Sequence, residues 1–520
     1  MNFAFLAAIG KIDNALTERK NYAFAKGRGM KQKSLYLLIG LCWLCSTTAW
    51  AQDGWELTAW GARAAGMGGV DLAIATDATA INTNPAGLIQ LRGHRVDLGS
   101  GFYLPAAHFQ NKLNDQDNDS LFVPLPQAAW GYHPKDAMIA FGFGAFTEGG
   151  SWSDFTLKNA LLGDDTRYYS NFNYYKLAPA FAIQPHKMIS IGVAPALGLA
   201  SMKFDMPFYL PPRHLEGLAD PSNGYQFSKI FGNSPAAGGL GYKEITTRLK
   251  INDATSMSVG GKVGLLIQPL PSLSLGAAYT LQSWMLFRGH ATLDMTAQFE
   301  DARDRMIDQK VAAGLTPGQA EKAVQAELLS YGIEGGKTGM AARWDTNINF
   351  HWPQKVAVGV AYSPGESWLI GVDGTWINWS ETMNTLKLYL KKPDNYKVQQ
   401  VIGLEHFNAF TPMNWIDQYV VGLGVQYRFL EDFWGRAGYN YGNDPIPART
   451  VTPVFPAIAE HHATLGLGYR YELLEVNAAF EQAFANTQEA GPDSQVGSEY
   501  DNSKTTGGGS TLNLMLSFMF

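Results

Sequence analysis

The chain has 520 residues, of which 17% are charged, 12% are aromatic and 55 are glycine. So few charged residues are unusual for a soluble enzyme, and the formal net charge of −6 argues against a nucleic-acid partner, which requires a basic surface. No break in composition divides residues 95–520, so we expect one large domain.

The N-terminal leader has the layout of a secretory signal peptide. Lys31 and Lys33 precede an apolar run over residues 35–45, and Ala-Trp-Ala at residues 49–51 follows as a small-x-small cleavage site. The run has about 11 residues, which is too short for a membrane-spanning helix; a membrane anchor is the alternative interpretation.

We therefore predict a signal peptide over residues 1–51 and a mature chain that begins at Gln52. Met30 directly precedes the first lysine of the leader, so Met30 is an alternative initiator. Both cysteines, Cys42 and Cys45, lie in the leader, so we expect a mature chain without cysteine.

A glycine-rich segment, residues 52–93, separates the leader from the first predicted strand. It contains Gly-Ala-Arg-Ala at residues 61–64, Gly-Met-Gly-Gly at residues 66–69 and Asn84-Pro85-Ala86 near its end. Such glycines allow tight backbone turns. A phosphate loop is excluded, because the lysine and the serine or threonine that it requires do not follow the glycines.

Beyond residue 94, apolar residues alternate with small or polar ones over many short stretches. The clearest are residues 137–146, 188–199, 273–288 and 512–520. Alternation places the apolar side chains on one face of a β-strand, and a tilted membrane-spanning strand needs about 9 to 11 residues. For any single stretch, a core-facing strand of a soluble sandwich is the alternative.

Similar stretches begin near residues 95, 126, 173, 256, 354, 367, 418, 432, 462 and 474. Together they make about 14 strands, an even number, as bacterial barrels with both termini in the periplasm require. We predict an all-β fold, a transmembrane antiparallel β-barrel over residues 94–520. Side chains cannot fill so wide a lumen, so we expect residues 52–93 to fold inside it as a plug.

One long loop, residues 298–333, changes to helical periodicity. Phe299, Ala302 and Met306 recur at helix spacing, and Thr-Pro-Gly-Gln at residues 316–319 has the pattern of a capping box with proline at the first helical position. We predict a helical hairpin that caps the outer mouth of the barrel, either as part of a ligand site or only packed on the loop.

The segment before the first strand closely resembles the N-terminal hatch of the FadL family of outer-membrane transporters for hydrophobic substrates. The Gly-x-Arg-Ala element, the glycine-rich turn, Asp77 and Asn84-Pro85-Ala86 occur in the order and spacing of that family. Residues 434–439, residues 443–447 and the closing Phe520 are similar to its late strands, so the resemblance covers about residues 55–520.

The resemblance implies a 14-stranded barrel, plugged by its N-terminal segment, that admits long-chain fatty acids or other greasy molecules without an energy source. Some relatives take aromatic hydrocarbons instead. The chain departs from the fatty-acid prototype in its long loops and in His461-His462, so the resemblance does not fix the substrate. The resemblance also implies that the protein lies in the bacterial outer membrane, surrounded by its lipids. We expect it to be a monomer.

A fatty acid needs an apolar groove and a cation for its carboxylate, and alternation suggests which cations face the lumen. If Met257 and Val259 face lipid, the alternation places Lys262 on the lumen side. If Leu275 and Phe287 likewise face lipid, Arg288 and Trp284 face the lumen. If Tyr439 faces lipid, Arg436 faces the lumen. A charge on the lipid face near the midplane would cost about 2 to 4 kcal/mol, which also favours this placement.

We therefore predict Lys262, Arg288, Arg436 and Trp284 as ligand-binding residues. The alternative is that each cation pairs with a carboxylate of the plug or wall and never meets the substrate. Within the hatch, we expect Arg63 to anchor the plug to the wall. Asn84 and Pro85 are expected to fix the return of the hatch toward the first strand, with gating as the alternative role.

Enzyme signatures are missing from the sequence, and we predict neither catalytic residues nor a cofactor or metal. No Gly-x-Ser-x-Gly elbow occurs, and the adjacent His461 and His462 of a strand point to opposite sides. Asp115, Asp117 and Asp119 have calcium-loop spacing, but Ser120 replaces the required glycine and Pro126 the bidentate glutamate.

The sequence thus predicts a transporter for passive uptake of hydrophobic molecules, with long-chain fatty acids first and aromatic hydrocarbons second. Two other classes remain open. An outer-membrane lipid hydrolase would need a Ser and His pair on adjacent strands near the headgroups. An adhesin barrel would bind partners through its long loops while its lumen stays shut.

Overall fold

The computed structural model describes residues 53–119, 122–333 and 339–520, which belong to one compact unit. The predicted signal peptide over residues 1–51 lies outside the described residues. No helix in these described ranges is both long and apolar enough to cross a bilayer.

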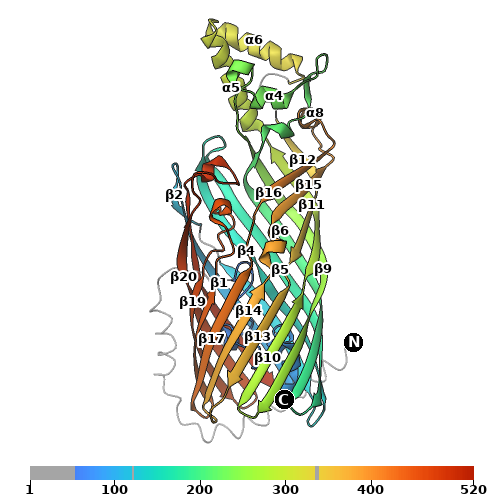
Figure 1. Ribbon diagram of the computed structural model, residues 1–520, viewed down its shortest axis with the longest axis vertical. Coiled ribbons are helices and arrows are strands. Elements are labelled where there is room, and N and C mark those ends of the chain that lie inside the picture. Colours follow the sequence, from blue (N-terminus) through green and yellow to red (C-terminus); the bar gives the residue numbers. More distant parts are fainter. Residues whose placement is uncertain (1–52, 120–121, 334–338) are drawn as a thin grey trace, which may run out of the picture. The chain divides into compact units, whose positions relative to one another are not determined.

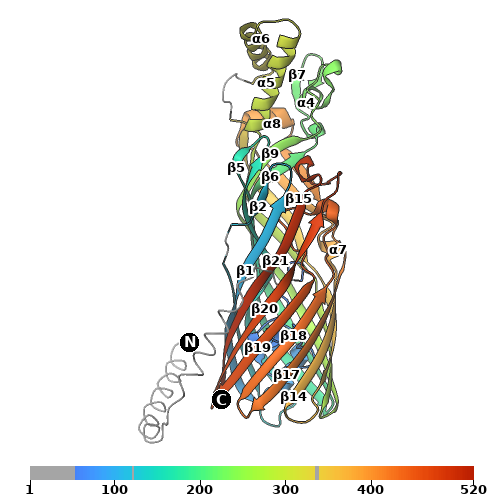
Figure 2. The same ribbon diagram turned by 90° about the vertical axis from the view of Figure 1, so that its left-hand side faces the viewer.

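Fourteen antiparallel strands close into a barrel (Figure 1), which confirms the predicted fold. The last strand, β21 (Lys504–Met519), pairs with the first, β1 (Gly93–Gln110), and the two lie side by side in Figure 2. A closed sheet leaves no free edge in lipid. The other continuous wall strands are β3 (Val123–His133), β4 (Ile139–Asn159), β5 (Gly163–His186), β6 (Ile189–Leu210), β9 (Ile245–Leu270), β18 (Phe433–Gly442), β19 (His461–Tyr471) and β20 (Leu474–Glu489).

The remaining four wall strands are each interrupted once. In wall order they are β10 (Leu273–Leu281) with β11 (Ser283–Asp294), β13 (Lys355–Tyr362) with β12 (Ala341–Trp352), β14 (Trp368–Ile377) with β15 (Thr385–Lys391), and β17 (Gln418–Leu430) with β16 (His406–Pro412). We call the barrel end with short connections the turn end and the opposite one the loop end. The segments at the turn end have 8 to 13 residues, which matches the membrane-spanning length of about 9 to 11 residues.

The two faces of the wall differ as alternation predicts. On β6, Ile191, Val193 and Leu197 are exposed while Ala194 and Ala196 are buried. The last strand follows the same rule, with its even-numbered apolar residues exposed on the outer face. A belt of exposed apolar side chains on a closed sheet is the surface that lipid covers.

Helices and small strands gather at the loop end (Figure 1). The predicted helical hairpin is observed as α5 (Thr296–Ala312) and α6 (Pro317–Ser330), and α6 begins with the predicted capping box of Thr316 and Gln319. The shorter elements of the loops are β2 (Asp115–Asp117), β7 (Leu218–Asp220), β8 (Tyr225–Gln226), η3 (Pro212–His214), α4 (Phe227–Gly232), η4 (Pro235–Ala237), α8 (Tyr396–Ile402), η5 (Ala448–Thr450) and η6 (Ser498–Tyr500). The helix α7 (Trp379–Thr382) lies at the interruption between β14 and β15.

The segment before β1 lies inside the barrel. Its helices α3 (Ala62–Ala65), η1 (Ala78–Ile81) and η2 (Pro85–Gln90) contact wall strands on opposite sides of the lumen, η2 against β5, β6 and β9 and α3 against β19, β20 and β21. We call residues 53–92 the plug.

Wall glycines let the backbone of the plug approach the wall closely. A Cβ at Gly276 would lie 2.2 Å from the carbonyl oxygen of Leu72, and one at Gly424 would lie 2.4 Å from that of Met67. Any larger residue at these wall positions would therefore displace the plug. Alternating small residues in the strands thus form the seat of the plug.

Candidate functional site

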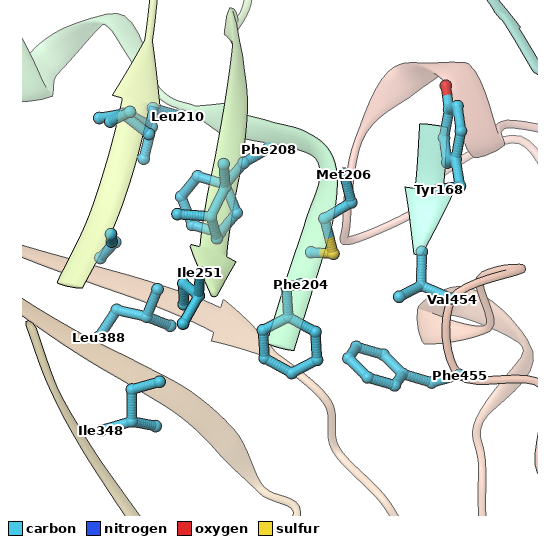
Figure 3. Packing of buried hydrophobic residues seen from close by; sticks show 14 of the residues in the cluster. Tyr168, Phe204, Met206, Phe208, Leu210, Ile251, Ile348, Leu388, Val454 and Phe455 are labelled. Atoms are coloured by element: carbon cyan, nitrogen blue, oxygen red, sulfur yellow. The ribbon is translucent and has the colours of Figure 1, made fainter. Parts of the chain in front are cut away.

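The lumen at the loop end is lined by apolar side chains. They are the inward members of the alternating strands, and all are buried. Figure 3 shows Phe204, Met206, Phe208 and Leu210 of β6, Ile251 of β9, Ile348 of β12, Leu388 of β15, and Val454 and Phe455 of the loop between β18 and β19. We call this space the apolar chamber.

Aromatic rings separate the apolar chamber from the plug. The indole of Trp55, at the start of the plug, lies 5.2 Å from the ring of Phe172, 6.0 Å from Phe350 and 5.7 Å from Trp415, measured between ring centroids. These spacings are those of favourable aromatic pairs. We call this layer the aromatic floor; it consists of Trp55, Phe172, Phe350, Trp352, Trp379 and Trp415.

A loop segment, residues 451–459, folds into the apolar chamber. Hydroxyl groups of the wall hold it, because Ser153 donates to the carbonyl of Pro453 at 2.6 Å and Ser170 to that of Val454 at 2.7 Å. The void left beside Val454 and Phe455 measures only about 20 Å³, about the space of one water molecule. In this structure the chamber is therefore filled by its own loop.

Buried charges lie on the plug side of the aromatic floor. Glu56 accepts a hydrogen bond of 2.7 Å from the indole N–H of Trp352 and pairs with the ammonium of Lys355, while Glu148 pairs with Lys176 at 2.7 Å. We call Glu56, Glu148, Lys176, Lys262 and Lys355 the charged layer. Buried charges persist only when paired and hydrogen-bonded; the first pair joins the plug to β13, and the second joins β4 to β5.

Lys262 faces the lumen on β9. Its ammonium donates to the main-chain carbonyl of Asn82 in the plug and lies 5.6 Å from the ring centre of Trp60. It also lines an internal pocket of about 80 Å³ that is bordered by Glu56 and Lys355. Its role in binding a ligand remains a prediction.

Arg436 also faces the lumen, but it lies near the turn end of β18. Its guanidinium donates to the side-chain oxygens of Gln426 at 2.7 Å and Asn477 at 2.8 Å. Both partners belong to the wall, so this geometry favours the structural alternative over contact with a ligand in the apolar chamber.

The hatch residues are all buried. Arg63 lies in α3, which packs against β19 to β21. The amide of Asn84 donates to the carbonyls of Leu72 and Leu265 at 2.8 and 3.0 Å, and its oxygen caps η2 ahead of Pro85. Asn84 thus links two parts of the plug to β9.

Arg288 and Trp284 lie on the outer face, so the prediction that they point inward is wrong. Trp284 is 66% exposed, whereas Phe287 is fully buried inside the barrel. The prediction assumes that one regular alternation continues across Gln282, but β10 ends and β11 begins there. At this interruption the outward side changes from odd positions, such as Tyr279, to even ones.

The acidic residues of the charged layer and the tryptophans of the aromatic floor are not among the residues predicted from the sequence. Lys176 could have been found as the one cation among apolar and aromatic residues at positions 172–182. Glu56 and Glu148 carry no such signal, because both lie outside the regular alternating stretches, and only the fold brings them to the lysines.

The main-chain ladder between β3 and β4 does not extend to the loop-end half of β4, where Thr147 donates from its side chain to the carbonyl of Pro126. Pairing between these strands covers only residues 127–132 of β3. Beyond it, Pro124 and Pro126 have no N–H to offer, and β4 turns inward at residues 147–150, which are all buried. There Gly150 donates instead to the carbonyl of Trp55 at 2.8 Å. We call this interruption of the ladder, which adjoins the aromatic floor through Trp55, the lateral gap.

Comparison with known proteins places these features in one family. The family model described as outer membrane protein transport protein (OMPP1/FadL/TodX) matches residues 42–520. No curated protein sequence matches the chain. The Pseudomonas putida toluene transporter TodX is similar in structure, with a TM-score of 0.63, 17% identity and coverage of 90% of this chain and 100% of that one.

Two further solved structures show the same fold. A Pseudomonas aeruginosa FadL homologue has a TM-score of 0.65 at 15% identity, over 90% of this chain and 100% of that one. The Ralstonia pickettii toluene transporter TbuX has a TM-score of 0.60 at 16% identity, over 89% of this chain and 99% of that one.

Proposed function

Because the chain belongs to the OMPP1/FadL/TodX family of outer membrane transport proteins, we propose that it takes up long-chain fatty acids through the apolar chamber. The observation that supports this most is the stacking of an apolar chamber on a layer that contains Lys262, whose ammonium is paired with no carboxylate among the described residues. The loop end then faces the cell exterior and the turn end the periplasm.

The chamber would hold the alkyl tail. Each methylene that leaves water contributes about 0.8 kcal/mol, and the chamber walls are mostly aliphatic and aromatic. The tail can enter only after Val454 and Phe455 withdraw, because their side chains occupy the space. The segment 451–459 is therefore the proposed gate.

Lys262 would hold the carboxylate. Its present partner is a neutral carbonyl of the plug, so an incoming carboxylate would replace a neutral acceptor with a charged one, and charge-assisted hydrogen bonds are the stronger kind. The binding of substrate would thereby compete with a contact between plug and wall.

The lateral gap between β3 and β4 is the proposed exit. It lies next to Trp55 and Trp60 of the plug, since Trp60 donates to the carbonyl of Thr147 at 2.8 Å. A hydrophobic molecule that leaves sideways enters lipid and does not have to cross the charged layer. Transport of this kind needs only a concentration gradient.

Aromatic hydrocarbons are the second candidate. The aromatic floor offers six rings, and two of the similar structures are described as toluene transporters. A neutral hydrocarbon would need the chamber and the lateral gap but not Lys262.

Uptake of labelled oleate, toluene and a polar sugar, in cells that lack their own transporter, tests the proposal. We expect the protein to accelerate oleate entry most. Faster entry of toluene alone would favour the second candidate, and faster entry of the sugar alone would indicate a general porin. If no labelled compound enters faster, the result would favour the adhesin alternative. Release of fatty acid from added phospholipid would favour the hydrolase alternative.

A further inference from the structure

The barrel wall is loosened where β9 passes from β10 to β11. Pairing of β9 with β10 ends at Gly261 opposite Leu281, and pairing with β11 begins at Thr255 opposite Arg288. Residues 256–260 of β9 therefore have no ladder partner on this side, although they pair with β6 on the other. Figure 1 shows β9 along the side of the barrel with β10 and β11 next to it.

An open groove of about 670 Å³ lies over this loosened part of the wall. Its apolar half is formed by Tyr175, Leu199, Met257 and Leu286, which are all between 37% and 66% exposed on the outer face. Hydrocarbon-facing side chains around a hollow of this size provide the surface that an acyl chain fills.

The other half of the groove is polar. On β6, β9 and β11, the outward residue that follows the apolar one toward the loop end is Ser201, Thr255 and Arg288, respectively. The groove thus crosses the boundary between the hydrocarbon belt and the headgroup level, which is where a lipid changes from chain to headgroup.

Arg288 is the charged residue of the groove, and no carboxylate in the described part of the chain lies within ion-pair distance of it. The nearest acidic residues along the neighbouring strands, Asp253 and Asp345, face His290 instead. A guanidinium forms paired hydrogen bonds with a phosphate and stays charged at any working pH. Outer-leaflet lipids carry their phosphates at this level of the membrane.

Unpaired strand edges in contact with lipid are otherwise avoided, because hydrocarbon offers no hydrogen-bonding partners. The headgroup would lie beside Thr255 and Arg288, at the loop-end edge of the unpaired residues 256–260, and the acyl chain would cover Met257 within them. The same ligand would therefore cover the unpaired stretch of β9 and pair with the cation.

We propose that this groove is a specific site for one phosphorylated lipid of the outer leaflet, with its phosphate on Arg288 and an acyl chain along Leu199, Met257 and Leu286. The bound lipid would close the loosened wall outside the apolar chamber, since the neighbouring inward residue Phe287 packs on Phe172 of the aromatic floor at 6.0 Å. This inference does not depend on which substrate the chamber carries.

Mass spectrometry of the intact protein, purified from outer membranes and exchanged into fresh detergent, tests the site. We expect the wild type to retain a phosphorylated lipid and Arg288→Ala to retain at least fivefold less. Leu199→Trp, which fills the apolar half, is expected to lower retention while Arg288 is still present. Arg343→Ala, which removes an exposed arginine of the same outer face beyond the groove, is the matched control and should retain as much as the wild type.

Adding phosphatidic acid, oleate or diacylglycerol to delipidated protein separates the possible headgroups. Arg288-dependent binding of phosphatidic acid but not of diacylglycerol supports the site. Binding of oleate alone, equal retention in wild type and Arg288→Ala, or equal losses in Arg288→Ala and Arg343→Ala would overturn it. Heat-modified migration of each variant on gels verifies that the barrel is folded, and oleate uptake by Arg288→Ala tests the proposed transport separately.

Discussion

The indole nitrogen of Trp352 donates a hydrogen bond of 2.7 Å to the carboxylate of Glu56. This contact joins the aromatic floor to the charged layer, and it joins a wall strand to the plug. Glu56 also pairs with Lys355, so a single carboxylate fixes two wall residues whose side chains are buried.

Replacement of Glu56 by glutamine is expected to loosen the plug. The variant keeps an acceptor for Trp352 but leaves the ammonium of Lys355 buried without its partner, which costs about 3–5 kcal/mol. The midpoint temperature of heat-modified migration should fall. Glu366→Gln is the control, because Glu366 is 92% exposed in its pair with Arg428 and such surface pairs contribute little. Equal midpoints for the two variants would contradict this role of Glu56.

Replacement of Lys262 by methionine is expected to weaken oleate binding about tenfold and to leave the binding of methyl oleate unchanged, because only the acid offers a carboxylate to the ammonium. Calorimetric titration of both ligands measures this difference. Arg436→Met serves as the matched control, since wall amides hold Arg436. Equal losses for acid and ester in Lys262→Met would remove the carboxylate role.

Replacement of Phe455 by alanine is expected to open the gate. Its ring packs on Trp55 at 5.5 Å and on Phe204 at 5.6 Å, and truncation of a buried Phe costs about 3–5 kcal/mol of packing. The initial rate of oleate uptake should rise severalfold. Phe429→Ala, at an exposed ring near the turn end, should leave the rate unchanged. A rate that falls in Phe455→Ala would show that the ring binds substrate and does not block it.

Replacement of Gly276 by alanine is expected to displace the plug, because the added Cβ would meet the carbonyl oxygen of Leu72 at 2.2 Å. Gly374→Ala on β14 is the matched control, since nothing lies within 4 Å of a Cβ there. A displaced plug would let large polar molecules pass through the barrel, and the sensitivity of cells to a large polar antibiotic measures this passage. Equal antibiotic sensitivity of cells with Gly374→Ala and with Gly276→Ala would contradict this prediction.

The local stability of the turn at Glu499, in the loop between β20 and β21, is expected to fall as pH rises. Burial raises the pKa of Glu499 above its ordinary value, against the hydrogen bonds that it accepts from Tyr168 and Asn159. A raised pKa in the folded state means that the stabilisation is complete at low pH and is lost as pH rises through the folded pKa. Protection factors of residues 498–501, which correct for the intrinsic pH dependence of amide exchange, should therefore be lower at pH 8 than at pH 5, and Glu499→Gln should lose the difference.

The sequence predicts the barrel well because alternation is a local signal. In the membrane-spanning segments at the turn end, lipid-facing positions are mostly apolar and inward ones mostly small or polar, so the pattern repeats from strand to strand. The family motifs likewise lie in one continuous segment, and the helical loop has its own capping box at Thr316.

The interior could be predicted only in part. Lys262 follows from alternation because β9 is unbroken around it, whereas Arg288 and Trp284 were misplaced by the interruption at Gln282. The pairing of Glu148 with Lys176 depends on the register at an irregular point of the β4–β5 ladder, and the pairing of Glu56 with Lys355 depends on where the plug enters the lumen. That position follows from contacts between residues far apart in the chain, and no spacing in the sequence encodes it.

Photo-crosslinking with a fatty acid that carries a diazirine at its terminal carbon tests the central claim most directly. We expect labelling of chamber residues such as Phe204, Met206 and Ile348, lost on competition with oleate and weakened in Lys262→Met. Labelling confined to lipid-facing residues such as Val259 and Leu465, unaffected by oleate, would contradict passage through the apolar chamber.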